Sequence, residues 1–370
     1  MNELLHTIPG ADPLPVASGW FLFLSYLTYY LHLIAVGIMF GTGVSMTLGY
    51  FKAKREKQWI PFAVRMSKIL PFSIAFAINL GVAPLLFIQV LYGNFFYTAS
   101  ILVGIPWLLL ILLLIFAYYS AYWLIFKKEA APAAHAGMTP LGRKPSVALF
   151  ITIILAWTGF MLVNVNTLMM TPAKWHSYFN HMSGFHLNLS ETTLFPRYIF
   201  YLFLLLCIGG MFIAIFYKIK DRLEESGTGF HYGCNVSGAF ALFSLPAFVL
   251  YLFMLPGEIR GVFLGGSGLW TAAAALFVLG LLAVGILGMK KKAVPAALLL
   301  TLDLVVFVFT RNHIRYLYLK PFEKKFPVLG QHTQYGVMVL FFAVLAAGLG
   351  LVAWILIKTA KETRVLNSTE

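Results

Sequence analysis

The stretch GWFLFLSYLTYYLHLIAVGIMFGTGVSMTLGY, residues 19–50, places this chain in a lipid bilayer. It runs for 32 residues without one Asp, Glu, Lys or Arg. A helix that crosses the hydrocarbon core of a membrane needs about 20 predominantly apolar residues. The stretch therefore predicts a transmembrane helix that is long enough to tilt or to project beyond the bilayer.

Eight more apolar stretches follow along the chain. They lie near residues 64–92, 98–126, 146–171, 195–217, 232–255, 269–289, 293–310 and 334–357. The composition agrees, since 60% of the 370 residues are hydrophobic and only 11% are charged, against about a quarter charged in soluble domains. No long internal repeat divides the chain. We therefore expect residues 1–370 to form a single all-α membrane domain of about nine transmembrane helices.

Lysine and arginine residues are divided unequally between alternate connections. If the amino terminus lies outside, the inner connections hold 19 of them and the outer connections hold eight. Because cytoplasmic loops carry an excess of Lys and Arg, the sequence predicts an external amino terminus, an internal carboxy terminus and a bacterial inner (plasma) membrane. The same clusters explain most of the formal charge of +14, so we expect membrane lipid and no nucleic acid as a partner.

His32 is the only histidine that lies well inside a confident span. Small residues follow it, namely Ala35, Gly37, Gly41 and Gly43, and they allow another helix or a flat macrocycle to approach closely. A neutral imidazole is a common ligand of haem iron. With no second histidine at that depth, and no CxxC or CxxCH for covalent attachment, a pentacoordinate haem b is the simplest cofactor hypothesis. The alternative is a histidine that hydrogen-bonds to a neighbouring helix.

Asp303 is the only carboxylate deep inside a predicted span. An unpaired charge at that depth costs about 3 kcal/mol on insertion scales, so the side chain must be protonated, paired or hydrated. Arg311 lies eight residues further on, roughly 12 Å along a helix, so a pair would need long reach. Asp303 is thus a candidate for proton transfer or for contact with a quinone. The alternative is a neutral aspartic acid hydrogen-bonded across helices.

Five basic residues between the last two spans lie on the predicted outer side, where the positive-inside bias does not explain them. A cationic outer face is suited to docking an acidic redox partner, such as a periplasmic cytochrome c, or to holding haem propionates. Binding of lipid headgroups is the alternative. The five residues are Arg311, Arg315, Lys320, Lys324 and Lys325.

Three segments resemble subunit I of the cytochrome bd quinol oxidases. They are YYLHLIAVGIMFGTGVSMTLGYF (29–51), FAINLGVAPLLFIQVLYGNFFYTASILVG (76–104) and LAWTGFMLVNVNTLMMTPAKW (155–175). They are similar to the first helix of that family, to its second helix and following turn, and to its fourth helix and exit loop. The final third of the chain shows no such motif. The resemblance implies a nine-helix fold with an external amino terminus, and it places an axial haem histidine at His32.

The chain also departs from that family at positions that matter for its chemistry. Phe200 stands at or beside the position of the second haem histidine. The third span, PWLLLILLLIFAYYSAYWLIF, has no glutamate, and the seventh has no internal methionine to serve as the other axial ligand. The connection 256–268 is far too short to be the family's quinol-oxidation loop. We therefore do not expect this chain to reduce oxygen to water.

The leading hypothesis is a bd-like membrane subunit of a respiratory electron-transfer complex. It would carry at most one haem b, bound through His32, and pass electrons between membrane quinone and an outer partner. A second hypothesis keeps the fold without the cofactor and makes the chain a haem-free anchor or scaffold for catalytic subunits. A third is a small-solute transporter that works through Asp303.

Overall fold

The computed structural model describes residues 8, 14, 17–126, 141–180, 182–220, 228–325 and 334–368. Within these ranges the protein is helical and contains no strand, and nine of its helices are long and apolar enough to cross a membrane. The prediction of an all-α, multi-pass membrane protein is therefore confirmed. The nine helices are α2 (Ser18–Ala53), α3 (Trp59–Leu102), α4 (Gly104–Phe126), α5 (Lys144–Met170), α6 (Leu194–Lys220), α7 (Thr228–Phe253), α9 (Gly268–Met289), α10 (Ala293–Leu319) and α11 (Tyr335–Ser368).

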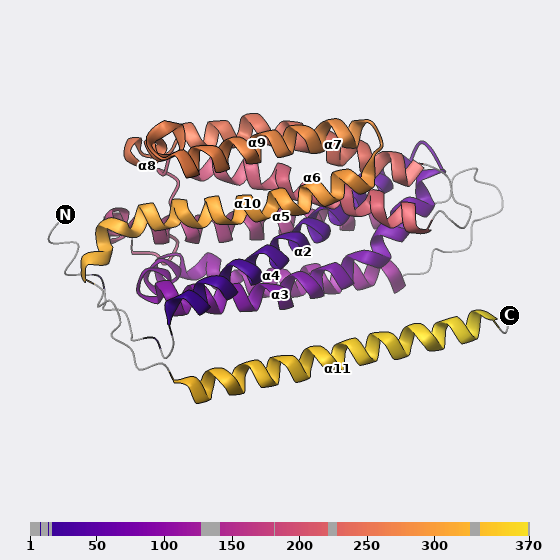
Figure 1. Cartoon of the computed structure of the whole chain (residues 1–370). Helices are drawn as coiled ribbons and strands as arrows, with labels where there is room; N and C mark the ends of the chain where they lie inside the picture. The colour runs from indigo at the N-terminus through magenta and orange to yellow at the C-terminus, as the bar shows by residue number, and fades with distance from the viewer. Residues whose placement is uncertain are drawn as a thin grey trace.

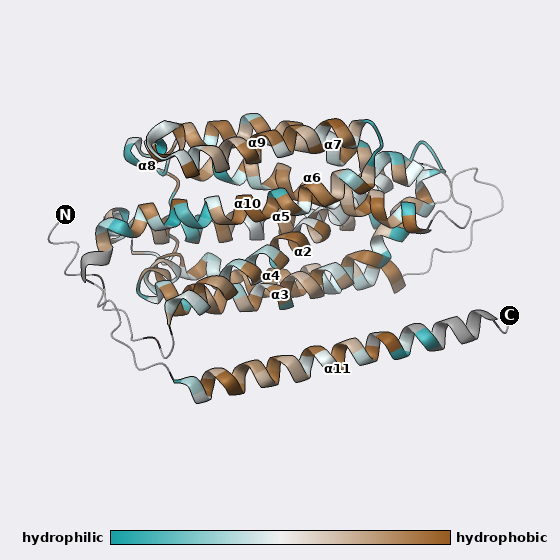
Figure 2. Ribbon diagram, in the orientation of Figure 1, coloured by the Kyte–Doolittle hydropathy of each residue, from teal (hydrophilic) through white to brown (hydrophobic). Residues whose placement is uncertain are grey.

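Four short elements complete the described chain. The 3-10 helix η1 (Pro172–Asn180) follows α5, α8 (Gly257–Gly261) and the π-helix η3 (Val262–Gly266) connect α7 to α9, and η4 (Lys320–Lys325) follows α10. The long helices run side by side along one common direction (Figure 1). Apolar residues dominate their middle portions and hydrophilic residues gather at the two ends of the bundle (Figure 2), as expected when lipid surrounds the middle.

The second and third spans meet at a different place from the one that hydropathy predicts. We expected a connection near residues 93–97, but α3 continues to Leu102 with a kink at Tyr92, whose φ is −137° and ψ is 27°. The reason is packing. Phe95 and Phe96 are buried, and their rings contact Trp175 and Trp107 at centroid distances of 6.4 and 5.8 Å. These contacts keep the segment helical.

The eighth span is also longer than predicted. We expected it to end near residue 310, but α10 continues for nine more residues to Leu319. Asn312 and Arg315 on this extension are buried. A polar run at the end of an apolar stretch normally marks entry into water, but here these side chains face the interior of the bundle. The extension brings Arg315 to the cavity described below.

Helix α2 is central to the bundle and contacts α3, α5, α6 and α10. Its closest approach is to α6, where Gly41 faces Gly209 so tightly that a side chain on either glycine would overlap the other backbone. Such small residues let helix backbones pack closely in lipid. Helix α11, in contrast, lies apart from the other helices (Figure 1), and none of its described side chains is buried.

Candidate functional site

A cavity of about 400 Å³ lies inside the bundle, between α2, α3, α5, α6 and α10. Its size falls within the range of ligand sites, about 300–1,000 Å³. Most of its wall is apolar, and a few polar side chains project into it. The apolar lining includes Leu33, Val36, Met39, Phe40, Leu85, Leu155, Leu162, Leu202 and Leu205.

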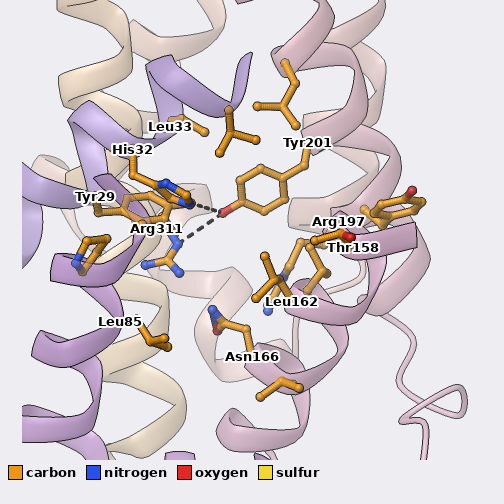
Figure 3. A pocket seen from close by; sticks show the side chains of 18 of the residues that line it. Tyr29, His32, Leu33, Leu85, Thr158, Leu162, Asn166, Arg197, Tyr201 and Arg311 are labelled. Atoms are coloured by element: carbon orange, nitrogen blue, oxygen red, sulfur yellow. Dashed lines mark hydrogen bonds between the residues drawn. The ribbon is translucent and has the colours of Figure 1, made fainter. Parts of the chain in front are cut away.

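His32 projects from α2 to the wall of this cavity (Figure 3). Its Nδ1 lies 3.1 Å from the carbonyl oxygen of Ala77 on α3. A carbonyl oxygen only accepts, so Nδ1 carries the hydrogen and Nε2 keeps its lone pair. Metal-ligating histidines are held in this way, with the second ring nitrogen donating to a backbone carbonyl or a carboxylate. The imidazole is thus fixed in the tautomer that leaves Nε2 available to a ligand atom.

The same imidazole lies directly against the backbone of α3. A Cβ atom built on Gly81 would lie 2.7 Å from Cε1 and 3.0 Å from Nδ1 of His32. Only glycine leaves room for the ring at this point. The sequence therefore supplies both the hydrogen-bond partner and the space that orient His32.

Three arginines line the cavity together with His32. Arg197 comes from the beginning of α6, and Arg311 and Arg315 come from the extension of α10. Arg197 is 5% exposed and Arg315 is 2% exposed, and the Nε and Nη2 atoms of both have no hydrogen-bond partner among the described residues. No Asp or Glu is among the described residues of the lining. Buried charges are normally paired. These two guanidinium groups lie over the rings of Tyr251 and Tyr92, at 5.0 and 5.3 Å, and their Nε and Nη2 atoms can still donate to an anionic group.

The structure separates the five basic residues that the sequence places on one outer face. Arg311 and Arg315 do not share an outer basic face with the lysines that follow them, because they lie on α10 and line the cavity. Lys320 is exposed just beyond the helix. Lys324 and Lys325 belong to η4, and their side chains lie outside the described part of the structure.

Arg311 differs from the other two arginines in its contacts. Its Nε donates to the hydroxyl of Tyr201 over 3.2 Å, and its Nη1 donates to Oδ1 of Asn312 over 3.3 Å. The hydroxyls of Tyr201 and Tyr29 lie 3.1 Å apart. Figure 3 shows Tyr201 reaching from α6 toward Tyr29 and Arg311, next to His32. This cluster joins α2, α6 and α10.

Asp303 lies elsewhere in the bundle. Its side chain is 4% exposed, it lies against Gly280 of α9, and its Oδ2 has no hydrogen-bond partner within the described ranges. Asp303 does not line the cavity, whereas Phe307, one turn further along α10, does. The ring of Phe307 contacts Phe200 and Phe277 at centroid distances of 5.4 and 5.3 Å. An aromatic cluster therefore lies between Asp303 and the polar end of the cavity.

A folded loop lies after α5, at the end of the bundle where α2 begins. Within it, Lys174 and Glu191 form an ion pair of 2.8 Å, and the indole of Trp175 donates to the carbonyl oxygen of Leu168 over 2.9 Å. The amide Oδ1 of Asn164, inside α5, accepts a hydrogen bond from the backbone N–H of Asn188 over 3.2 Å. The loop is therefore attached to the helix ends around the cavity.

Sequence reasoning identified His32 but missed three further residues of this site. Arg197 resembles an ordinary basic flank of an apolar span, and Tyr29 and Tyr201 resemble apolar helix residues with aromatic rings. The one available signal was the spacing of Tyr29, which precedes His32 by three residues and so shares its helix face.

Comparison of the chain with protein-family models, with curated proteins and with solved structures gave no match. Within the described ranges, no group of three or more His, Cys, Asp or Glu side chains is placed to hold a metal ion. The candidate site therefore has to be interpreted from its own geometry.

Proposed function

We propose that this chain is the membrane subunit of a cytochrome bd-like electron-transfer complex in a bacterial plasma membrane, and that it binds one b-type haem. The observation that carries the proposal is the cavity itself. It combines one oriented imidazole, His32, with apolar walls and with the unpartnered N–H groups of Arg197 and Arg315. A flat apolar macrocycle with one metal and two carboxylates matches each of these features.

The lining residues have separate roles in this proposal. His32 would hold the iron through Nε2, and the Ala77 carbonyl, which accepts from Nδ1, would keep Nε2 unprotonated. Arg197 and Arg315 would hold the propionates through charge-assisted hydrogen bonds. The bound haem would supply one-electron transfer. The protein would exclude water from the apolar part of the macrocycle.

A single haem agrees with the packing around Phe200. This residue is fully buried, and its ring contacts Phe248, Phe277 and Phe307 at centroid distances of 5.2, 6.1 and 5.4 Å. His32 is the only histidine among the described lining residues. Phenyl side chains thus fill the region where the resemblance would place the second haem ligand. Electron transfer without oxygen reduction is the activity that this arrangement supports.

Access from the lipid supports a quinone as the electron-exchange partner. Ile78 and Val82 of α3 and Leu162 of α5 line the cavity and are also exposed on the outside of the bundle, by 41%, 50% and 42%. The cavity therefore reaches the lipid-facing surface between these two helices. A lipid-soluble carrier can approach the site by this route without passing through water.

The deciding experiment is a reduced-minus-oxidised optical spectrum of the purified chain. We expect a b-type Soret and α-band in the wild type and in His176→Ala, which replaces an exposed histidine of η1, and loss of these bands in His32→Ala. All three proteins should be recovered from the membrane in similar amounts. An unchanged haem signal in His32→Ala would remove His32 as the ligand.

A haem-free scaffold is the second candidate, and one observation favours it. The His32 Nδ1 hydrogen bond to Ala77 satisfies the imidazole without any ligand. In this case the exposed apolar side chains of α11 would contact other membrane subunits. Wild-type protein that is folded and shows no Soret absorbance would support the scaffold over the haem protein.

A further inference from the structure

The hydrogen bonds among Arg311, Tyr201 and Tyr29 form a chain that begins at the guanidinium group. A guanidinium group has no acceptor atom, so Arg311 Nε must donate to the Tyr201 oxygen, 3.2 Å away. The positive charge polarises that hydroxyl and makes it a stronger donor. Tyr201 can then donate its own hydrogen to the Tyr29 oxygen, 3.1 Å away. Either hydroxyl can donate in this second bond; when Tyr201 donates, the hydrogen of Tyr29 is left over at the end of the chain.

That hydrogen belongs to a residue of the cavity wall. Tyr29 and Tyr201 both line the cavity beside His32, and Tyr29 lies one helical turn before His32 on α2. The guanidinium carbon of Arg311 also lies 4.0 Å from the centre of the Tyr29 ring. This cation–π contact holds Tyr29 in place. The chain therefore provides one polarised O–H group at the wall of the cavity.

Neighbouring residues show that this arrangement is specific. Tyr30, next in sequence, does not line the cavity, and its hydroxyl donates to the backbone carbonyl of Thr301 over 3.3 Å. Arg197 and Arg315 leave their Nε atoms unpartnered among the described residues, whereas Arg311 uses its Nε within the chain. The arginines thus fall into two whose Nε atoms have no hydrogen-bond partner in the described ranges and one whose Nε donates to Tyr201.

We propose that the Arg311–Tyr201–Tyr29 chain donates the Tyr29 hydroxyl hydrogen to the cofactor site and raises the reduction potential of the haem bound there. This inference rests on the haem of the proposed function. A positive charge and the positive end of an O–H dipole both favour the reduced state, which carries one more electron. In this scheme Tyr29 contacts the cofactor through a hydrogen bond, Tyr201 positions and polarises Tyr29, and no proton or electron leaves either residue.

The test is redox potentiometry of the full-length haem-loaded protein with Tyr29→Phe, Tyr201→Phe, the double variant and the matched control Tyr30→Phe. Each phenylalanine removes one hydroxyl and keeps the ring. The potential is measured on the haem-loaded fraction of each of the four variants. The midpoint potential should fall in Tyr29→Phe and in Tyr201→Phe and stay at the wild-type value in Tyr30→Phe. The double variant should fall no further than the larger single change, because either substitution already breaks the chain.

The possible outcomes separate the two proposals. Wild-type protein without haem overturns the proposed function, and this inference with it. The hydrogen-bond chain alone is overturned if the haem-loaded variants have the midpoint potential of the wild type. It is also overturned if the effects of the two single substitutions add in the double variant. If Tyr30→Phe shifts the potential as much as Tyr29→Phe does, the effect belongs to general packing of α2, and the inference is again wrong.

Discussion

The imidazole of His32 is held by two features of one neighbouring helix. The Ala77 carbonyl accepts from Nδ1, and the missing side chain of Gly81 leaves space for the ring. Helix α3 therefore orients a residue of α2 through its backbone alone. A backbone partner of this kind is fixed by the fold and does not depend on a second side chain adopting the correct rotamer.

Gly81→Ala tests this arrangement. Alanine is favoured over glycine in a helix by about 1 kcal/mol, so α3 itself should gain stability. The new Cβ atom would lie 2.7 Å from His32 Cε1, which forces the imidazole to move. We expect the haem-to-protein ratio to fall several-fold while the yield of folded protein is kept.

Gly159→Ala is the matched control, since this glycine also lines the cavity but its added Cβ would meet only Tyr198 Cε2, at 3.9 Å. Its haem ratio, measured by the pyridine haemochrome assay, should equal that of the wild type. A full haem ratio in Gly81→Ala would show that the contact does not position His32.

The sequence predicts the site only in part at this scale, and the reason is physical. His32 stands out because an ionisable side chain is rare inside a long apolar span and is usually functional there. Arg197 and Arg315 do not stand out, because an arginine near the end of an apolar stretch normally extends to the headgroup region. Whether such a side chain points inward or outward depends on the helices around it, and that information is not local.

At the scale of helices, polar residues near the end of an apolar span make the end of the helix hard to predict from the sequence. Hydropathy ends the eighth span near residue 310, yet α10 continues to Leu319 because Arg315 has an internal cavity to face. The nine spans themselves were predicted correctly, since length and apolarity suffice to identify them. Their ends depend on tertiary contacts, as the burial of Phe95 in α3 also shows.

The loop after α5 gives a pH-dependent prediction. Burial raises the pKa of Glu191, but hydrogen bonds from Lys174 and Thr193 and the Lys174 charge outweigh it, and the pKa lies below the ordinary value for glutamate. Because its pKa is lowered, ionised Glu191 stabilises the folded loop at pH values above about 4.3, the ordinary pKa of glutamate. This contribution is lost as the pH falls through the lowered pKa.

We therefore expect Glu191→Gln to lower the amide protection factors of residues 182–193 at pH 7, corrected for the intrinsic exchange rate, to the level that the wild type reaches only in acid. The exposed Glu258 of α8 supplies the control, Glu258→Gln, which should leave this exchange unchanged. Exchange in Glu191→Gln equal to that of the wild type at pH 7 would contradict a stabilising role for the ion pair.

At the scale of the whole molecule, the protein consists of a packed bundle and one helix beside it. Every other long helix has buried residues, whereas the described side chains of α11 are all exposed except Met338 and Phe342, which are half-buried. The rings of Trp20 and Phe342 touch at a centroid distance of 5.4 Å. In lipid, helices associate mainly through close packing and interhelical hydrogen bonds, so a helix with so little buried surface contributes little to the bundle.

Truncation after residue 333 should therefore leave the bundle and its cavity intact, because every described residue of the cavity lining precedes that point. We expect the shortened protein to keep the haem-to-protein ratio of the full chain and to unfold in detergent within a few degrees of it. Truncation after residue 256 is the contrasting control, since it also removes α9 and α10 with Arg311 and Arg315, and it should abolish haem binding. If removal of α11 alone caused the same loss, the helix would have to pack against the bundle in the membrane, and its exposed face would be part of the folded core.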